Sequence, residues 1–336
     1  MYQLVHLSDL HYDTSNREKV RALLDAAVER NPDHLIISGD LTADGRAFQF
    51  RGLRDLLWKS GFSGNRLTVV PGNHDMYGFI YQTFSHPCGV LGGIKGVHSL
   101  KLAVKRLWRY KERLTRFGEE DYRESLYAFF FHFEDTFDGS LTVEGSRCGF
   151  PFVKLLPHNI ALIGVDTNYL QPRLYHLFNL LRRARRVART HDITLLGENL
   201  SGSTGAVELH ALEKILTMRQ VQKRRKILVL HHCLYPLNYL LSHVREAYAK
   251  EMRLTNQPEV SELLQRHGVD LVLHGHKHSL DHYRLPNGLQ VLNGGGTMGE
   301  GFFGIEVTGK TLGIRRILPD QPTGHFHAYE EPVPLE

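Results

Sequence analysis

Five short apolar runs in this chain each end in a cluster of aspartate, asparagine or histidine. In chain order the clusters are Asp9-Leu10-His11, Gly39-Asp40, Gly72-Asn73-His74-Asp75, His231-His232 and Gly275-His276-Lys277-His278. The runs that precede them, such as Leu35-Ile36-Ile37, have the length and composition of buried strands. Metal-ligating side chains at several strand ends are what a preformed site lined with oxygen and nitrogen requires. The pattern therefore indicates a metal site and hydrolytic chemistry.

Strands and helices alternate through the first third of the chain. The apolar positions Val20, Leu23, Leu24 and Ala27 recur with the helical period, and a proline at residue 32 follows that helix. The pattern predicts strands at residues 4–7, 34–38 and 67–70, and helices at 16–30 and 47–59. This βαβαβ order implies a mainly parallel sheet with its site at the carboxyl ends of the strands.

The same kind of pattern returns after two interruptions. It predicts strands at residues 149–156, 160–165, 227–230 and 270–273, and helices at 204–220 and 258–267. An antiparallel end follows, with strands at 282–285, 289–292, 302–307 and 311–317 and a hairpin turn at Asn287-Gly288. Residues 1–318 are predicted to form one domain, and we expect the proline-rich tail 319–336 to be loosely ordered.

The composition is that of an ordinary globular enzyme. Hydrophobic residues make up 42% and charged residues 23% of the 336 residues. The apolar runs are far shorter than the roughly 20 residues that span a bilayer. The chain enters a strand-like run at Tyr2 without a signal peptide, so we expect a cytoplasmic protein. The chain has three widely spaced cysteines, Cys88, Cys148 and Cys233, and so few in so long a chain argue against a disulfide framework.

The clusters supply seven candidate metal ligands, none of which is a thiolate. They are Asp9, His11, Asp40, Asn73, His231, His276 and His278. Carboxylate and imidazole donors suit divalent manganese, iron or zinc, among which we favour manganese. The set is large enough for two ions that share one carboxylate, at a separation of about 3.5–4 Å and with a shared hydroxide as nucleophile. The neutral asparagine limits the negative charge around the ions, so an anionic phosphate can still approach.

In their order along the chain, the five clusters resemble the motifs of the calcineurin-like metallophosphoesterase superfamily, from residue 9 to residue 278. The resemblance implies an α/β fold of four layers, with two packed mixed β-sheets flanked by helices. It implies that one ion is held by Asp9, His11 and His278, the other by Asn73, His231 and His276, and that Asp40 bridges them. His74 would stabilise the phosphoryl oxygens and protonate the leaving group, and Asp75 would orient the His74 imidazole.

Three histidines near the clusters are expected not to bind metal. His232 and His274 are set aside only because the family pattern uses their neighbours, and His6 is expected to be a packing residue. The chain also departs from the pattern in one place. In many members the His-His pair is followed by two prolines, whereas here Cys233-Leu234-Tyr235-Pro236 follows. The loop near the second ion can therefore differ in shape, and substrate is not inferred from it.

Helical insertions are predicted at about residues 77–137 and 170–199, and they carry much of the formal net charge of +5. Residues 173–189 contain six arginines and no acid, and Arg182, Arg185 and Arg186 are candidate substrate-binding residues. A basic amphipathic helix can pack on its own domain, cover a lipid substrate at an anionic membrane, or contact nucleic acid. The aromatic run 127–133 is expected to be core or a dimer contact, or to line an acyl groove.

The motif style is closest to cyclic-nucleotide phosphodiesterase-like members of the superfamily. The function it implies is two-metal hydrolysis of a phosphodiester or pyrophosphate bond in a nucleotide-containing small molecule. The basic insertions leave an alternative open, a UDP-2,3-diacylglucosamine pyrophosphatase of lipid A synthesis that acts on a lipid-linked nucleotide at the inner face of the membrane. No nucleic-acid partner is expected. A non-catalytic scaffold on the same fold is disfavoured, because every expected ligand is present.

Overall fold

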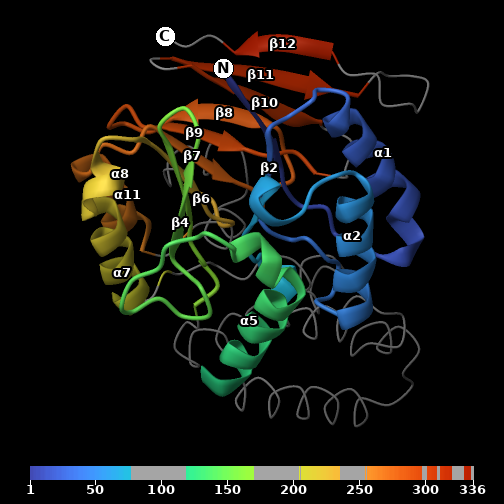
Figure 1. Ribbon diagram of the computed structural model, residues 1–336, viewed down its shortest axis with the longest axis horizontal. Coiled ribbons are helices and arrows are strands. Elements are labelled where there is room, and N and C mark those ends of the chain that lie inside the picture. Colours follow the sequence, from blue (N-terminus) through green and yellow to red (C-terminus); the bar gives the residue numbers. More distant parts are fainter. Residues whose placement is uncertain are drawn as a thin grey trace, which may run out of the picture.

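Two mixed β-sheets lie between two groups of helices in the computed structural model of the chain (Figure 1). Helices α1 (Arg17–Val28) and α2 (Ala47–Lys59) lie on one side, and α7 (Ala206–Thr217), α8 (Arg219–Gln222) and α11 (Gln257–Arg266) lie on the other. The predicted arrangement of two mixed sheets flanked by helices is confirmed. The structure describes residues 1–76, 119–169, 204, 206–234, 254, 256–296, 301–308, 311–319 and 329–333.

The first sheet has the strand order β12-β11-β10-β1-β2-β3. Its strands are β1 (Tyr2–Leu7), β2 (His34–Ile37), β3 (Leu67–Val69), β10 (Phe302–Val307), β11 (Leu312–Leu318) and β12 (Tyr329–Val333). Strands β1, β2 and β3 are parallel, and β10, β11 and β12 join them as antiparallel neighbours. The predicted parallel beginning thus meets part of the predicted antiparallel end in this sheet, where β1 pairs with β10, whereas the predicted strands 282–285 and 289–292 belong to the second sheet.

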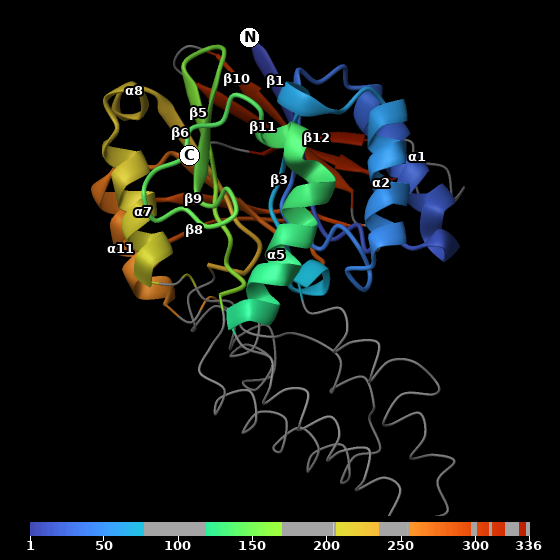
Figure 2. The same ribbon diagram turned by 60° about the horizontal axis from the view of Figure 1, so that its bottom comes forward.

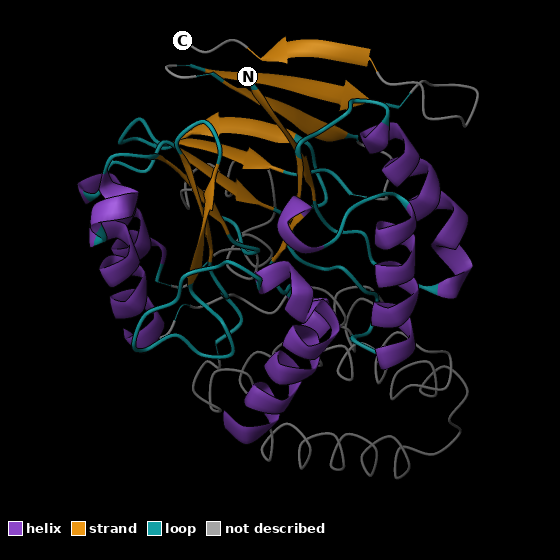
Figure 3. Ribbon diagram, viewed as in Figure 1, coloured by secondary structure: helices purple, strands orange, loops and turns teal. Residues whose placement is uncertain are grey.

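The second sheet has the strand order β4-β5-β6-β7-β9-β8. Its strands are β4 (Phe152–Leu156), β5 (Ile160–Gly164), β6 (Arg225–Val229), β7 (Leu271–His274), β8 (Asp281–Arg284) and β9 (Gln290–Asn293). Strands β5, β6, β7 and β9 are parallel, whereas β4 and β8 are antiparallel edges. The strands of both sheets are drawn between the two groups of helices in Figure 3.

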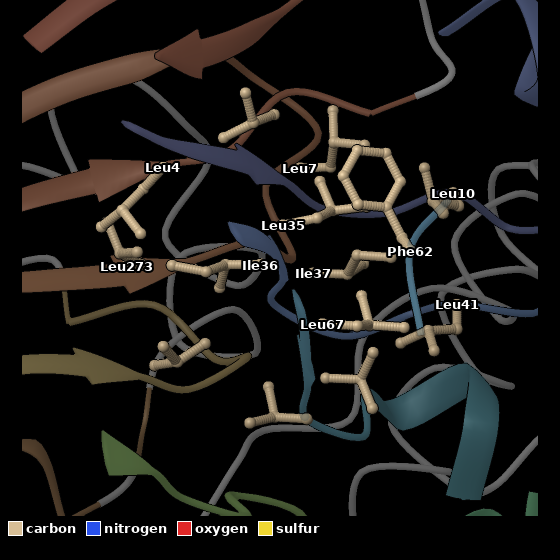
Figure 4. Close-up of a cluster of buried hydrophobic side chains, with 14 of the residues drawn as sticks. Leu4, Leu7, Leu10, Leu35, Ile36, Ile37, Leu41, Phe62, Leu67 and Leu273 are labelled. Carbon is tan, nitrogen blue, oxygen red and sulfur yellow. The ribbon is translucent and has the colours of Figure 1, made fainter. Parts of the chain in front are cut away.

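The main hydrophobic core lies between the two sheets, and strand alternation explains it. On β6, Ile227 and Val229 join the core between the sheets, while Leu228 joins a second cluster beneath α7 and α11. Successive strand residues point to opposite faces, so a continuous apolar run serves two cores at once. Figure 4 shows part of the first core, with Leu4, Leu35 and Ile37 of one sheet and Leu273 of the other. A fully buried side chain of this kind contributes about 1.5–3 kcal/mol.

Helix α5 (Glu119–Phe133) lies between the two helix groups, with α2 on one side and α7 on the other (Figure 2). It falls at the end of the predicted insertion 77–137, most of which is outside the described residues. Phe129 and Phe133 are fully buried and pack on Phe50 of α2, so this part of the aromatic run is core, as one of the predictions had it. The 3-10 turn η3 (Glu134–Phe137) follows, and two others, η1 (Thr14–Asn16) and η2 (Gly64–Arg66), precede α1 and β3.

Two sequence-based predictions need correction. The tail after Leu318 is not loosely ordered throughout, because Tyr329–Val333 forms β12 and pairs with β11 along the sheet edge. The predicted helix 204–220 is broken at Met218, whose backbone is extended (φ −58°, ψ 134°) and separates α7 from α8. In the part of the chain that the structure describes, no helix has the length and apolar character needed to cross a bilayer.

Candidate metal centre

The seven predicted ligands come together where the two sheets meet. They follow the carboxyl ends of β1 (Asp9, His11), β2 (Asp40), β3 (Asn73), β6 (His231) and β7 (His276, His278). In the first sheet β1, β2 and β3 are parallel, and in the second sheet β6 and β7 are parallel. The carboxyl ends of the ligand-bearing strands therefore lie at the same edge of each sheet. The prediction that strand order would gather these clusters is therefore met by the topology.

The backbone of the ligand loops is held in an unfavourable conformation. Asp9, His11, Asp40, His276 and His278 all have positive φ values, from 42° to 74°. Such residues number nine outside glycine in the described chain, so more than half of them are candidate ligands. A non-glycine residue in this region costs on the order of 1–3 kcal/mol and persists only where the surroundings enforce it. The strained backbone lowers the stability of the fold, and it directs the ligand side chains toward one another.

Two glycines allow the ligand loops to approach this closely. A Cβ on Gly39 would overlap the His231 imidazole, and Gly39 has a φ of 96°. A Cβ on Gly275 would overlap the Ser8 hydroxyl and the Asp9 carboxylate. Any side chain at these positions would push apart loops of the two sheets. The glycines of the Gly-Asp and Gly-His motifs are therefore required by packing against the ligands themselves.

The first donor group consists of Asp9, His11, Asp40 and His278, whose ligating atoms all lie within 4.8 Å of one another. The Nε2 atoms of His11 and His278 are 2.9 Å apart, and Asp9 Oδ1 lies 3.6 Å from His278 Nε2. When two ligand atoms each lie about 2.0–2.2 Å from one ion, their own separation depends on the ligand–metal–ligand angle. It is about 2.9 Å for a right angle and about 3.4 Å for a tetrahedral angle. The group therefore fits a divalent ion.

The second donor group consists of Asp40, His231 and His276, and Asn73 adjoins it. Asn73 Oδ1 lies 2.9 Å and His276 Nδ1 3.2 Å from His231 Nε2. Asp40 belongs to both groups. Its Oδ1 lies 3.4 Å from His231 Nε2, whereas its Oδ2 lies 3.7 Å from His11 Nε2. One carboxylate thus turns one oxygen toward each group, which is the geometry of a bridging ligand.

Electrostatics favour the ligating protonation state of His11, His276 and Asp40, but not that of Asp9, whose pKa is raised by burial, or that of His231. Burial lowers the pKa of His11 and of His276 well below its usual range, so both rings are neutral. Burial also opposes the ionisation of Asp40, but the adjoining His231 holds its pKa well below the usual range. For His231, burial acts to lower the pKa, and the Asp40 carboxylate outweighs it and raises the pKa to about 9. A cation in the second group would take the place of that proton.

The neighbouring histidines make their hydrogen bonds away from both groups. His232 Nδ1 lies 2.8 Å from the Thr167 hydroxyl, His274 Nε2 lies 2.8 Å from the Tyr283 hydroxyl, and His6 Nε2 lies 2.8 Å from the Ser38 hydroxyl. Each of these contacts engages one ring nitrogen with a hydroxyl group, and that none of the three histidines is a ligand stays a prediction. Cys233 is buried, and its thiol donates to the carbonyl oxygen of Gly275, which leaves it beside the site without a place in either group.

His74 lies at the edge of the centre, with its Nε2 4.0 Å from Asp40 Oδ2 and its ring 4.5 Å from that of His11. Its backbone N–H donates to Asp40 Oδ1 at 2.8 Å. Its Nδ1 lies 2.8 Å from the carbonyl oxygen of Ala43. A carbonyl oxygen only accepts, so Nδ1 carries the proton and Nε2 faces the metal ligands.

The structure gives Asp75 a different role from the predicted one. Its buried carboxylate accepts from the backbone N–H groups of Leu41 (3.0 Å), Thr42 (2.9 Å) and Gly72 (2.9 Å). It thereby ties the loop after β2 to the loop after β3, while the Ala43 carbonyl orients the His74 ring. Residues 73–76 are helical, and successive helical side chains point about 100° apart, so neighbours in sequence do not face each other. Burial and the charge of Asp40 raise the pKa of Asp75 to about 7.

The described residues of the centre differ in exposure. The ligands Asp9, Asp40, Asn73, His231 and His276 are buried, whereas the side chains of His11, His74 and His278 are 16%, 20% and 35% exposed. A substrate would therefore reach the centre past these three imidazoles, with the first donor group nearer the opening. The predicted substrate residues Arg182, Arg185 and Arg186 lie outside the described residues.

Sequence reasoning missed one polar cluster beside the second donor group. Asp166, Thr167 and Asn168 are buried and follow the carboxyl end of β5, next to β6 in the sheet. The signal was available, since Asp-Thr-Asn follows a predicted strand in the same way as the ligand clusters do.

Comparison with known proteins agrees with this geometry. The sequence model of the family described as calcineurin-like phosphoesterase matches residues 2–280. A probable cyclic nucleotide phosphodiesterase from Vesicomyosocius okutanii subsp. Calyptogena okutanii (strain HA) is 29% identical over 91 residues, which are 25% of this chain and 38% of that relative. The match thus spans well under two thirds of the relative's length. Among solved structures, a dimetal phosphatase from Danio rerio has a TM-score of 0.56 at 13% identity, over 93% of this chain and 95% of that one. This likeness shows the fold.

Proposed function

The chain belongs to the calcineurin-like phosphoesterase family, and we propose that it hydrolyses phosphodiester or pyrophosphate bonds with two divalent metal ions. The observation that carries the proposal is Asp40, whose two carboxylate oxygens face separate donor groups. The donors lack a thiolate, which favours manganese, iron or zinc, and we propose manganese. When bound, such ions neutralise phosphoryl charge and activate water.

The residues of the chain would bind the phosphoryl group, donate a proton to the leaving group and position the ligand loops. The opening beside His11, His74 and His278 admits a phosphoryl group on the side of the first donor group. His74 is held at Nδ1 by the Ala43 carbonyl, so only Nε2 can reach the substrate. A ring that carries a second proton at Nε2 can donate it to the leaving-group oxygen, and the ionised ring can contact phosphoryl oxygens. Asp75 acts one step away, by fixing the loops that carry Asp40 and Asn73.

A nucleotide-like organic diester is the proposed substrate class. The curated relative named as a probable cyclic nucleotide phosphodiesterase supports it, as does the style of the motifs. The segment after Ala43 offers suitable groups, because the Arg46 guanidinium lies 5.9 Å from the centre of the exposed Phe48 ring. Arginine and an aromatic ring, three and five residues beyond the Ala43 carbonyl that holds His74, suit a phosphate that carries a planar base.

The test compares cyclic AMP, bis(p-nitrophenyl) phosphate and the monoester p-nitrophenyl phosphate with manganese present. We expect turnover of the two diesters to exceed that of the monoester. Asp40→Ala should abolish activity and metal binding together, whereas His74→Ala should keep the metal and lose about 10²–10⁴ in rate. Asp55→Asn, an exposed position on α2, is the matched control and should leave both unchanged. Full manganese-dependent hydrolysis by Asp40→Ala would refute the two-metal proposal.

The sequence supports a second candidate, a lipid-linked nucleotide at an anionic membrane. It depends on the six arginines of residues 173–189. Charge reversal at Arg182, Arg185 and Arg186 should then weaken liposome binding and turnover of UDP-2,3-diacylglucosamine, and leave bis(p-nitrophenyl) phosphate unaffected. Equal losses with both substrates would exclude this candidate.

A further inference from the structure

Three consecutive polar residues, Asp166, Thr167 and Asn168, are buried beside the second donor group without belonging to it. They follow β5, and their side chains contact three other segments of the chain. Buried polar side chains cost stability unless their hydrogen bonds are made. A run of three at one strand end therefore needs a structural or functional reason, and the contacts of each residue identify it.

Asp166 anchors the loop to helix α5. Its Oδ2 accepts from the Tyr122 hydroxyl, and its Oδ1 accepts from the backbone N–H (2.9 Å) and the side-chain amide (2.7 Å) of Asn168. Tyr122 is itself buried, so this contact is shielded from water. The end of the predicted insertion 77–137 thus contributes one side chain that fixes the conformation of the loop.

Asn168 carries the contact from one sheet to the other. Its side-chain amide donates to the carbonyl oxygen of Pro71 at 2.9 Å. Pro71 directly precedes Gly72-Asn73, and the Asn73 side-chain oxygen lies 2.9 Å from His231 Nε2. A loop after β5 therefore sets the position of a ligand loop after β3. Loss of this bond would free the turn that presents the Asn73 oxygen.

Thr167 reaches the same donor group by another route. Its hydroxyl oxygen accepts from the backbone N–H of His232 at 3.3 Å and lies 2.8 Å from His232 Nδ1. The His232 ring lies 4.7 Å from that of His276 and 5.1 Å from that of His231. Thr167 thus fixes the orientation of an imidazole that packs against both histidines of the second group.

We propose that Asp166, Thr167 and Asn168, anchored by Tyr122, are positioning residues that set the affinity of the second donor group for its ion. Asp9 and His11 of the first donor group have different contacts, because their backbone N–H groups donate to the carbonyl oxygens of Gly39 and Asp40. Partners of this kind behind metal ligands typically change affinity by about 10–100-fold when removed. The inference rests on the two-ion centre of the proposed function.

The experiment titrates metal-free protein with manganese chloride in a calorimeter and follows the spin-coupled manganese pair by electron paramagnetic resonance. His278→Ala and His231→Ala identify which binding step belongs to which group. For Thr167→Val and Asn168→Ala we expect the second group to bind about 10–100-fold more weakly, with the first group unchanged. Tyr122→Phe, which acts through Asp166, should weaken the second group less and lower the signal of the coupled pair.

Thr136→Val, in η3, is the matched control, since it also removes a buried threonine hydroxyl, one that donates to the carbonyl oxygen of Phe133 at the end of α5. It should leave both affinities unchanged. Thermal unfolding of the metal-free variants separates a folding defect from a binding defect. If Asn168→Ala does not fold, the manganese affinities of Thr167→Val and Tyr122→Phe test the inference. Equal weakening of both groups, or no weakening of the second, would overturn the inference.

The binding measurements use no substrate, so they fail separately from the proposed reaction. Two-ion binding without diester hydrolysis would refute only the proposed function. A wild-type protein that binds fewer than two ions would overturn both proposals.

Discussion

Lys154 is a buried cation that joins the two sheets, and its removal is expected to stabilise the protein. It lies on β4, is 3% exposed, and donates to the carbonyl oxygen of Leu67 on β3 at 2.6 Å. β4 and β3 are edge strands of different sheets. Burial lowers the pKa of Lys154 to about 8 from an ordinary value of 10.5, although Asp135 and Asp138 act to raise it. The folded protein therefore disfavours the protonated, charged form of Lys154 relative to the unfolded chain.

The expected gain for Lys154→Met follows from these values. The lowered pKa means that the folded state holds the lysine proton less tightly than the unfolded chain, at a cost of about 3 kcal/mol at neutral pH. Methionine keeps the apolar stem but leaves the Leu67 carbonyl without its donor, which costs about 1–2 kcal/mol. The free energy of unfolding should then rise by about 1–2 kcal/mol at pH 7.

The dependence on pH has a definite sign. Between pH 8 and 10.5 the unfolded chain binds the Lys154 proton and the folded protein releases it, so wild-type stability rises with pH in this window. The advantage of Lys154→Met should therefore shrink from pH 8 upward and turn into a small deficit once the lysine is neutral in both states. His34, whose pKa Lys154 helps to lower, is neutral in the folded state of both proteins in this window and does not contribute to the difference.

The assay is urea unfolding of both proteins at neutral pH and at two alkaline values below pH 10.5. Lys59→Met, at an exposed position on α2, is the control and should change stability little at any pH. A Lys154→Met variant that is less stable at pH 7 would refute the reasoning. So would a stability difference that does not change with pH.

Three further predictions concern packing and acid stability. Gly275→Ala should cost about 1–3 kcal/mol and weaken manganese binding in calorimetry, because a Cβ there overlaps the Asp9 carboxylate, whereas Gly313→Ala has ordinary contacts and should do neither. Phe129→Ala should cost about 3–5 kcal/mol in urea unfolding, since Phe129 is fully buried against neighbouring aromatic rings; a smaller loss would mean that α5 contributes little to the core. Burial, reinforced by Lys154, lowers the pKa of His34 to about 3, so wild-type stability should fall as pH drops from 6.5 toward 3. His34→Gln should lose less stability over that range, and an identical slope in both proteins would contradict the assignment.

Local patterns predicted most of the secondary structure. The helix expected at 47–59 is observed at Ala47–Lys59, and the one expected at 258–267 is observed at Gln257–Arg266. The strand expected at 302–307 is observed without change. These elements carry strong periodicity or clear end signals, so the residues of the segment itself decide their state. The break at Met218 had no such signal, because helix-forming residues surround it.

Contacts between distant segments were less accessible to prediction. Tyr329–Val333 has no clear strand pattern, and it becomes β12 because β11 offers an open edge. The contacts of His74 with Ala43 and of Asp75 with the ligand loops depend on the directions of side chains in the helical residues 73–76. Adjacency in the sequence suggested a contact between His74 and Asp75, and helical geometry separates them.

The ligand types, their order and their placement after strands are local features, so the chemistry of the proposed centre can be predicted from the sequence alone. Seven side chains without a thiolate restrict the metals and, with the strand order, require one shared site. The division of that site into two donor groups depends on the three-dimensional fold. The fold directs the two oxygens of Asp40 to different donor groups, leaves His74 at the open side, and places Asp166 to Asn168 behind one group alone. Such assignments depend on the packing of two sheets, and distances between strands that are far apart in the chain are fixed only when the sheets meet.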